Sequence, residues 1–203
     1  MWSILTIALF STILITEGNI IIESPPETNY GEWGPWSRCP FGTYAQALQV
    51  RTEPYQGLFG DDTATNGIRL YCGDPNNGST IYITSTVAEW GNWGSVFSCR
   101  SDGRPLPPDG FVSGFQLRVE PPQGAGDDTS TNNARIFCTY PPHLGIPEEM
   151  KEGDGLTYGR WTSDRKCFSN QAICALQTQV ERYQGDPGDD TAMNNIRAEC
   201  CDR

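Results

Sequence analysis

The stretch Gly60-Asp61-Asp62-Thr63-Ala64-Thr65-Asn66-Gly67-Ile68-Arg69-Leu70-Tyr71-Cys72 decides the fold, because it occurs three times in the chain. It returns with substitutions at residues 126–138 and at residues 188–200. In each copy a cysteine follows the first aspartate at the same spacing. A unit repeated at a nearly constant interval is typical of a repeat architecture. We therefore divide the chain into three repeats, at about residues 19–78, 79–143 and 144–203.

Each repeat contains two segments in which apolar and polar residues alternate. A period of two is typical of a strand with one buried face, so we predict at least two strands per repeat. Residues 19–22 and 81–84 supply further strands at the repeat edges. The predicted inward-facing residues are Leu48, Val50, Thr52, Ile68, Leu70 and Cys72, with Phe115, Leu117, Val119, Ala134, Ile136 and Cys138, and Leu176, Thr178, Val180, Ile196, Ala198 and Cys200.

The fold class follows from the size of the repeat. A unit of about 60 residues buries its own apolar face poorly, whereas three units can share one core. The sequence therefore predicts an all-β domain with pseudo-threefold symmetry, either a prism of three sheets or a β-trefoil. Residues 101–110 and 141–155 are insertions that we expect on the surface.

The cysteines and the N-terminus indicate export. Residues 1–18 form a short apolar run of the kind found in secretory signal peptides, which predicts a secreted, extracellular protein. The chain has 8 cysteines, and an even number in an exported protein is typical of disulfides. The repeat symmetry predicts the pairs Cys39–Cys72, Cys99–Cys138 and Cys167–Cys200, which leaves Cys174–Cys201. An exchange of partners between the adjacent Cys200 and Cys201 is the alternative. Asn77 begins an Asn-Gly-Ser sequon in a turn-rich segment, so we expect an exposed glycan there.

Composition excludes several function classes. The net charge of −11 argues against nucleic acid and anionic membranes as partners. The chain has no Cys-x-x-Cys spacing and only one histidine, His143, so we predict no metal site and no Ser-His or Cys-His nucleophile. It also lacks phosphate-binding glycine motifs. We expect no cofactor, a monomer, and a neutral or cationic partner.

The motifs taken together resemble one protein family. Three Trp-Gly-x-Trp-like motifs, three Gln-Gly turns, three Gly-Asp-Asp-Thr elements leading to Asn-x-Ile-Arg or a close variant, and eight cysteines are similar to the vitelline membrane outer layer protein 1 family. The resemblance covers about residues 32–203. It implies a β-prism of three Greek-key sheets and a secreted protein of the egg's vitelline envelope or another extracellular fluid. It also implies a weak transfer activity on chito-oligosaccharides.

The carboxylates of the repeated turns have a structural and a functional interpretation. Asp and Thr in a glycine-flanked turn accept hydrogen bonds from nearby backbone amides, and the presence of the element in every repeat favours this structural role. The alternative is that the loops converge on a calcium ion or a sugar, or supply an acid/base pair for glycoside chemistry. The candidate catalytic residues are Asp61, Asp127, Asp189, Glu53, Glu120 and Glu181, and the candidate ligand-binding residues are Asp62, Asp128, Asp190, Tyr55 and Tyr183.

Two further sets of residues recur. We predict that Glu53, Glu120 and Glu181 form cross-strand pairs with Arg69, Arg135 and Arg197; solvated charges, or pairs with a neighbouring turn aspartate, are the alternatives. The motifs at residues 33–36, 90–93 and 158–161 each precede a cysteine. We expect their aromatic rings to lie in the core, with a sugar-stacking platform as the alternative. Tyr55 and Tyr183 should be exposed.

The sequence therefore predicts a non-enzymatic secreted protein that binds extracellular proteins or glycans. The alternative is a weak glycosyltransferase or hydrolase acting on N-acetylglucosamine oligomers.

Overall fold

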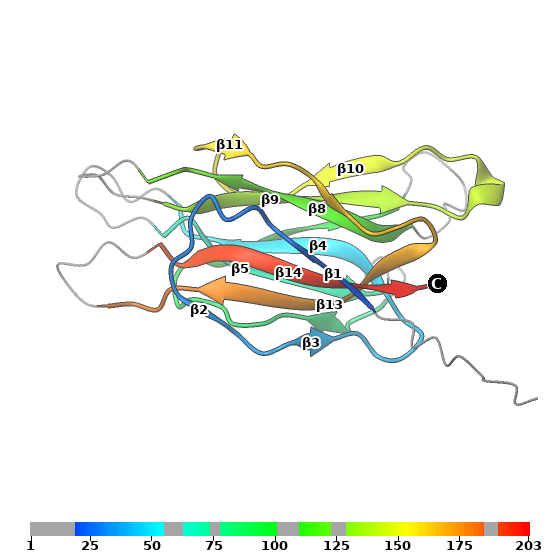
Figure 1. The fold of residues 1–203 in the computed structure, drawn as a ribbon, viewed down its shortest axis with the longest axis horizontal. Coiled ribbons are helices and arrows are strands. Elements are labelled where there is room, and N and C mark those ends of the chain that lie inside the picture. The colour runs from blue at the N-terminus through cyan, green and yellow to red at the C-terminus, as the bar shows by residue number, and fades with distance from the viewer. Residues whose placement is uncertain (1–18, 55–62, 74–77, 101–109, 123–128, 185–190) are drawn as a thin grey trace, which may run out of the picture.

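The computed structural model describes residues 19–54, 63–73, 78–100, 110–122, 129–184 and 191–203, which form three antiparallel sheets (Figure 1). The first sheet contains β4 (Ala45–Thr52), β5 (Thr65–Cys72), β6 (Tyr82–Ile83) and β7 (Asn92–Ser98). The second contains β8 (Phe111–Val119), β9 (Thr131–Thr139), β10 (Glu149–Glu152), β11 (Arg160–Trp161) and β12 (Arg165–Lys166). The third contains β13 (Gln171–Val180), β14 (Met193–Asp202), β1 (Ile20–Glu23), β2 (Glu32–Trp33) and β3 (Ser37–Arg38).

Each sheet has Greek-key connectivity. In the first sheet the order is β6-β5-β4-β7, so three consecutive strands are followed by a fourth that returns beside the first. The second sheet repeats this order, and the third is completed by β1, β2 and β3 from the N-terminal end of the described chain. The β-prism prediction is confirmed, and the β-trefoil alternative is wrong. Each sheet takes strands from two of the sequence repeats.

The core lies where the three apolar faces meet. The predicted inward-facing side chains are buried there, except that Thr52 is partly exposed. Leu48, Phe115 and Leu176, which are equivalent in the three sheets, are at most 2% exposed. The described residues contain no α-helix, and the single 3-10 turn at Pro142–Leu144 lies in the second predicted insertion. That insertion is mostly exposed, as predicted, but it also supplies strand β10. No described helix is long and apolar enough to span a bilayer.

The partners of the arginines on the outer face of each sheet differ from the predicted glutamates. The register places Gln49 opposite Arg69, Gln116 opposite Arg135 and Gln177 opposite Arg197. The glutamates lie beyond the ends of the paired strands, several residues from these arginines. The predicted cross-strand Glu–Arg pairs are therefore wrong. Each arginine instead stacks on a tryptophan, with the guanidinium carbon 3.8–4.2 Å from the ring centroid, in the pairs Arg69–Trp93, Arg135–Trp161 and Arg197–Trp33.

The aromatic motifs also differ from the prediction. Trp33, Trp93 and Trp161 are partly exposed on the outside of the sheets, so their assignment to the core is wrong. The glycines with positive φ that precede them are Gly31, Gly91 and Gly159. The equivalent motif in the first repeat is therefore Tyr30-Gly31-Glu32-Trp33, three residues earlier than the tryptophan pattern indicated. In this alignment Trp33, Trp93 and Trp161 each precede a cysteine by the same number of residues.

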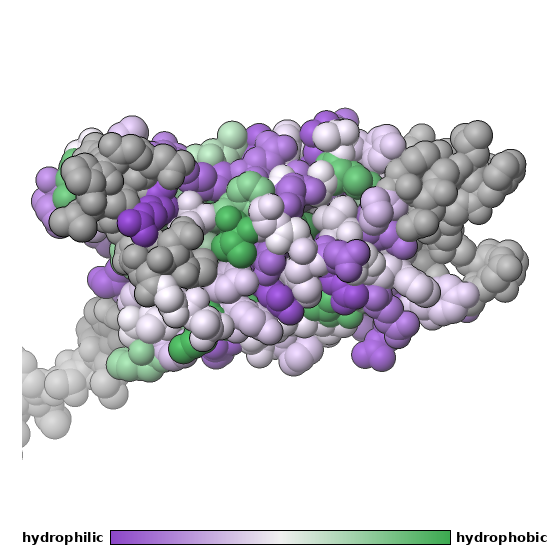
Figure 2. Space-filling view, turned by 180° about the vertical axis from the view of Figure 1, so that it is seen from behind, coloured by the Kyte–Doolittle hydropathy of each residue, from purple (hydrophilic) through white to green (hydrophobic). Residues whose placement is uncertain are grey.

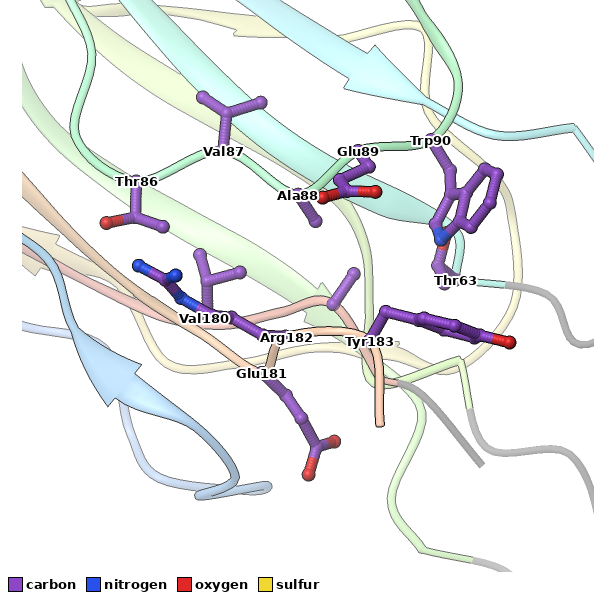
Figure 3. Close-up of a pocket in the computed structure, with 11 residues that line it drawn as sticks. Thr63, Thr86, Val87, Ala88, Glu89, Trp90, Val180, Glu181, Arg182 and Tyr183 are labelled. Atoms are coloured by element: carbon purple, nitrogen blue, oxygen red, sulfur yellow. The ribbon is translucent and has the colours of Figure 1, made fainter. Parts of the chain in front are cut away.

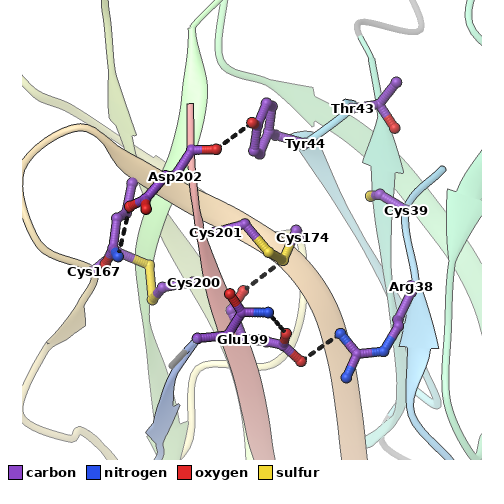
Figure 4. The surroundings of a disulfide bond; sticks show 12 residues. Arg38, Cys39, Thr43, Tyr44, Cys167, Cys174, Glu199, Cys200, Cys201 and Asp202 are labelled. Atoms are coloured by element: carbon purple, nitrogen blue, oxygen red, sulfur yellow. Dashed lines mark hydrogen bonds and ion pairs between the residues drawn. A yellow bond between two sulfur atoms is a disulfide. The ribbon is translucent and has the colours of Figure 1, made fainter. Parts of the chain in front are cut away.

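Disulfides join the sheets at the end where β5, β9 and β14 finish, called here the disulfide end. The four bonds match the four predicted pairs. Cys39–Cys72 joins the third sheet to the first, Cys99–Cys138 the first to the second, and Cys167–Cys200 the second to the third. Cys174–Cys201 lies within the third sheet, beside the Glu199–Arg38 ion pair (Figure 4). Three sulfur bridges thus close the prism around its axis.

Removal of an inter-sheet disulfide should lower the free energy of unfolding, because the unfolded chain gains conformational entropy. The double variant Cys99→Ala/Cys138→Ala opens a loop with a sequence separation of 39, and loop entropy gives an expected loss of about 4 kcal/mol in the free energy of unfolding. The matched variant Cys174→Ala/Cys201→Ala opens a shorter loop inside one sheet, with an expected loss of about 3–4 kcal/mol. Urea unfolding measures both, and a loss below about 1 kcal/mol for the first variant would contradict the prediction.

The glycine two residues before each tryptophan has a left-handed backbone, and the neighbouring strand leaves no room there for a Cβ atom. In Gly91→Ala the new Cβ would lie 2.4 Å from the carbonyl carbon of Thr52, at a φ of +73°. Gly42 has a φ of +77°, but nothing lies within 4 Å of its Cβ position. We expect Gly42→Ala to cost about 1–2 kcal/mol for the left-handed backbone, and Gly91→Ala about 1–3 kcal/mol more for the clash. Equal losses in chemical denaturation would show that the close approach is unimportant.

Candidate functional site

The start of the second strand in each sheet has an unusual backbone. Ala64, Ser130 and Ala192 adopt left-handed conformations with φ of 48–50°, which are costly for residues other than glycine. Two positions later, the register shifts by one residue, so that Asn66, Asn132 and Asn194 each form a β-bulge. All three asparagines are fully buried. These turns lie together at the opposite end from the disulfides, called here the turn end (Figure 1).

A Glu–Thr–Asn chain of hydrogen bonds holds each of these turns. In the third sheet the Thr191 hydroxyl donates to Glu181 over 2.6 Å and accepts from the Asn194 amide over 2.8 Å. The amide also donates to the carbonyl of Ala192, the left-handed residue, over 3.3 Å. The same bonds link Glu53, Thr63 and Asn66, and Glu120, Thr129 and Asn132. The threonine of each Gly-Asp-Asp-Thr element therefore has a structural role.

The candidate carboxylates divide into two groups. Glu53, Glu120 and Glu181 each accept a hydrogen bond in these chains, and the structure does not show them converging on a common site. Asp61, Asp62, Asp127, Asp128, Asp189 and Asp190 lie outside the described residues, as do Tyr55 and Asn77. Tyr183 is described and is 57% exposed, as predicted.

A cleft of about 380 Å³ lies at the turn end between the first and third sheets (Figure 3). One wall is residues 86–90, from the connection between β6 and β7, and the other is residues 180–183, at the end of β13. Trp90 and Tyr183 face each other across it, with ring centroids 6.1 Å apart and planes at 83°. Its apolar lining is Val87, Ala88, Val180 and Ala192, and its polar lining is Thr63, Thr86, Glu89, Glu181 and Arg182.

Both walls of this cleft are held by hydrogen bonds to buried or partly buried groups. Arg51 donates to the carbonyls of Ala88, Glu89 and Gly91 over 2.7–3.1 Å. The Trp90 amide donates to the buried Asn66 side chain, and the Thr178 hydroxyl donates to the Thr86 carbonyl. On the opposite wall, the Glu181 amide donates to the Ala192 carbonyl over 2.8 Å. Asn66 and Glu181, which take part in the hydrogen bonds of the repeated turns, therefore also position the cleft walls.

Sequence reasoning missed most of this site. It considered Trp90 chiefly as a core residue and did not single out Glu89 or Arg182. The available signal was the difference between repeats. Glu53-Pro54-Tyr55 and Glu120-Pro121-Pro122 correspond to Glu181-Arg182-Tyr183, so a charged residue replaces a proline in one repeat only.

The disulfide end carries a second, more open hollow. Lys166 lies there, bonded to Glu148 over 2.6 Å and 4.0 Å from the ring centroid of Phe137. Partial burial acts to lower the pKa of Lys166, but its contacts with Glu148 and Asp164 outweigh this and raise the pKa above its usual value. The face of the molecule in Figure 2 mixes polar residues with small, separate apolar patches. Among the described residues, the only cluster of metal-ligand types is Cys174, Glu199 and Cys201, whose cysteines are joined as a disulfide; it does not suit a metal.

Comparison with known proteins assigns the family. The model of the vitelline membrane outer layer protein I family matches residues 20–203. This chain belongs to that family. A mouse protein named vitelline membrane outer layer protein 1 homolog is 38% identical over 181 residues, covering 86% of this chain and 81% of the mouse protein. The human protein of the same name is 37% identical over 178 residues, covering 86% of this chain and 80% of its own. The resemblance seen in the sequence motifs is therefore confirmed.

Solved structures of low sequence identity share the fold. The Calystegia sepium agglutinin aligns with a TM-score of 0.51 at 10% identity, covering 91% of this chain and 97% of its own. A prostate-specific glycoprotein lectin, WGA16, aligns with a TM-score of 0.50 at 9% identity, covering 88% of this chain and 97% of its own. At these identities the likeness concerns the β-prism alone.

The hydroxyl in each Glu–Thr–Asn chain should be essential to stability. Thr191→Val keeps the shape but leaves Glu181 and Asn194 each without one partner, which should cost about 2 kcal/mol. Thr191→Ser keeps the hydroxyl and removes only a methyl group, so its loss should be about 1 kcal/mol. Urea denaturation compares the two variants. A valine variant as stable as the serine variant would mean that the turn is held by other contacts.

Proposed function

We propose that this chain is a secreted glycan-binding protein of an extracellular layer, of the kind that the egg's vitelline envelope represents. Family membership over residues 20–203 is the observation that carries this proposal. The four disulfides fit an oxidising, extracellular compartment. In this proposal residues 1–18 are removed as a signal peptide, residues 19–203 act as one monomeric domain, and Asn77 carries a glycan.

Two observations support glycans as the partner. The β-prism fold is shared with proteins described as lectins. One of them, Calsepa lectin, was solved in complex with a biantennary N-glycan and aligns with a TM-score of 0.50 at 9% identity, covering 92% of this chain and 98% of its own. The turn end also presents exposed aromatic rings in a cleft whose lining includes a carboxylate and a guanidinium. Apolar surface with a few fixed polar groups is the usual composition of a small-molecule site. Extracellular proteins remain alternative partners.

Expression in a secreting eukaryotic cell tests the proposal. The full chain should leave the cell with its N-terminus near Asn19 and with no free thiols. The purified protein should bind members of an array of neutral and sialylated oligosaccharides, including N-acetylglucosamine oligomers. Absence of binding to every glycan would overturn the glycan-binding proposal.

The same material distinguishes binding from catalysis. Incubation with N-acetylglucosamine oligomers, followed by analysis of product lengths, should show unchanged oligomers. Longer or shorter products would instead support the transferase or hydrolase alternative. The oligomers incubated with a parallel preparation from cells that do not express the chain are the control for contaminating activity.

A further inference from the structure

We infer that the cleft between the first and third sheets is a sugar site that binds one uncharged pyranose unit, and that each chain has one such site. This inference rests on the proposed glycan-binding function and assigns it a place. The cleft volume of about 380 Å³ lies within the range of about 300–1,000 Å³ that is usual for small-molecule sites.

The two aromatic rings provide the stacking surface. Trp90 is 43% and Tyr183 57% exposed, although they contact each other across the cleft mouth. Because their planes are nearly perpendicular, a pyranose lying flat on one ring presents its edge to the other. The C–H face of a sugar is apolar and suits the electron-rich face of an aromatic ring. The apolar residues of the lining, Val87 and Val180 among them, exclude water from the walls of the cleft.

The charged residues of the cleft lining favour a neutral ligand. Glu89 accepts hydrogen bonds from hydroxyl groups and Arg182 donates to hydroxyl oxygens, and their opposite charges offset each other at the cleft. Glu181 already accepts hydrogen bonds from Thr191 and Gln184 (2.6 and 2.7 Å). A chain with a net charge of −11 disfavours an anionic sugar over the neutral one.

The walls are fixed before a ligand arrives. Arg51 donates three hydrogen bonds to the wall that bears Trp90, to the carbonyls of residues 88, 89 and 91. Asn66 holds the Trp90 amide from within the protein. A site held in this way loses little conformational entropy on binding, so a small ligand is sufficient to occupy it.

The pseudo-threefold symmetry explains why the chain has one site. Tyr158 and Tyr30 are the equivalents of Trp90 in the other two sheets, and they are 43% and 45% exposed. Across from them, however, Pro54 and Pro121 stand at the position of Arg182, and Thr157 and Asn29 stand at the position of Glu89. The other two seams therefore lack the pair of opposite charges.

These equivalent aromatics are matched controls within one molecule. The neutral oligosaccharide that binds most strongly on the array is titrated calorimetrically into the mature, disulfide-intact wild type and into Trp90→Ala, Tyr183→Ala, Tyr158→Ala and Tyr30→Ala. We expect one bound oligosaccharide per chain. Trp90→Ala and Tyr183→Ala should each weaken binding at least tenfold, whereas the two control variants should change affinity less than twofold. Sialylated analogues should bind no better than their neutral parents.

The possible outcomes distinguish failure of the site assignment from failure of the proposed glycan-binding function. If the wild type binds glycans but Trp90→Ala and Tyr183→Ala bind equally well, the site assignment is wrong and the proposed function stands. Equal losses in all four variants, two or three ligands per chain, or a preference for sialylated glycans would also overturn the inference. If the wild type binds no glycan, the proposed function itself fails. Tyr183→Ala, at an exposed position, keeps the test valid if Trp90→Ala does not fold.

Discussion

The left-handed residue at the start of the second strand of each sheet is the constraint on which the structure depends. It turns the chain back at the turn end at the cost of about 1–2 kcal/mol for each L-residue. The Glu–Thr–Asn hydrogen bonds offset that cost and satisfy a fully buried asparagine amide at the β-bulge. Because each turn depends on partners within its own sheet, the element has to be repeated three times.

The two ends of the prism are closed by different chemistry. At the disulfide end, three covalent bonds link each sheet to the next around the axis. At the turn end, neighbouring sheets are joined by hydrogen bonds such as Ser130 to Asn194 and Thr178 to Thr86. The third sheet takes β1–β3 from the N-terminal part of the chain, and backbone pairing holds them against β13 and β14. Non-covalent closure leaves the turn end free to differ between repeats, and the cleft occurs there.

The residues that all three repeats share hold the structure, whereas the charged pair proposed for ligand binding occurs at only one of the three seams between sheets. The repeated residues, including the glutamate, threonine and asparagine of each turn and the tryptophan–arginine stacks, hold the sheets. Among the residues proposed to bind a sugar, the charged pair Glu89 and Arg182 breaks the repeat. A position that every repeat needs for folding has little freedom to acquire a ligand, whereas a surface position at one seam can change without affecting the other two.

The sequence by itself determined the threefold all-β core, the strands with their inward-facing residues, and the four cysteine pairs, because period-two patterns and repeat spacing are local properties of the chain. Its motifs also indicated the family. The tertiary structure decided which residues face each other across the strands and across the cleft. The register places glutamine, rather than glutamate, opposite each arginine, and the arginines stack on the tryptophans at the outside of the sheets. The cleft joins residues 86–90 to residues 180–183, and such a contact between distant segments depends on how the third sheet closes against the first.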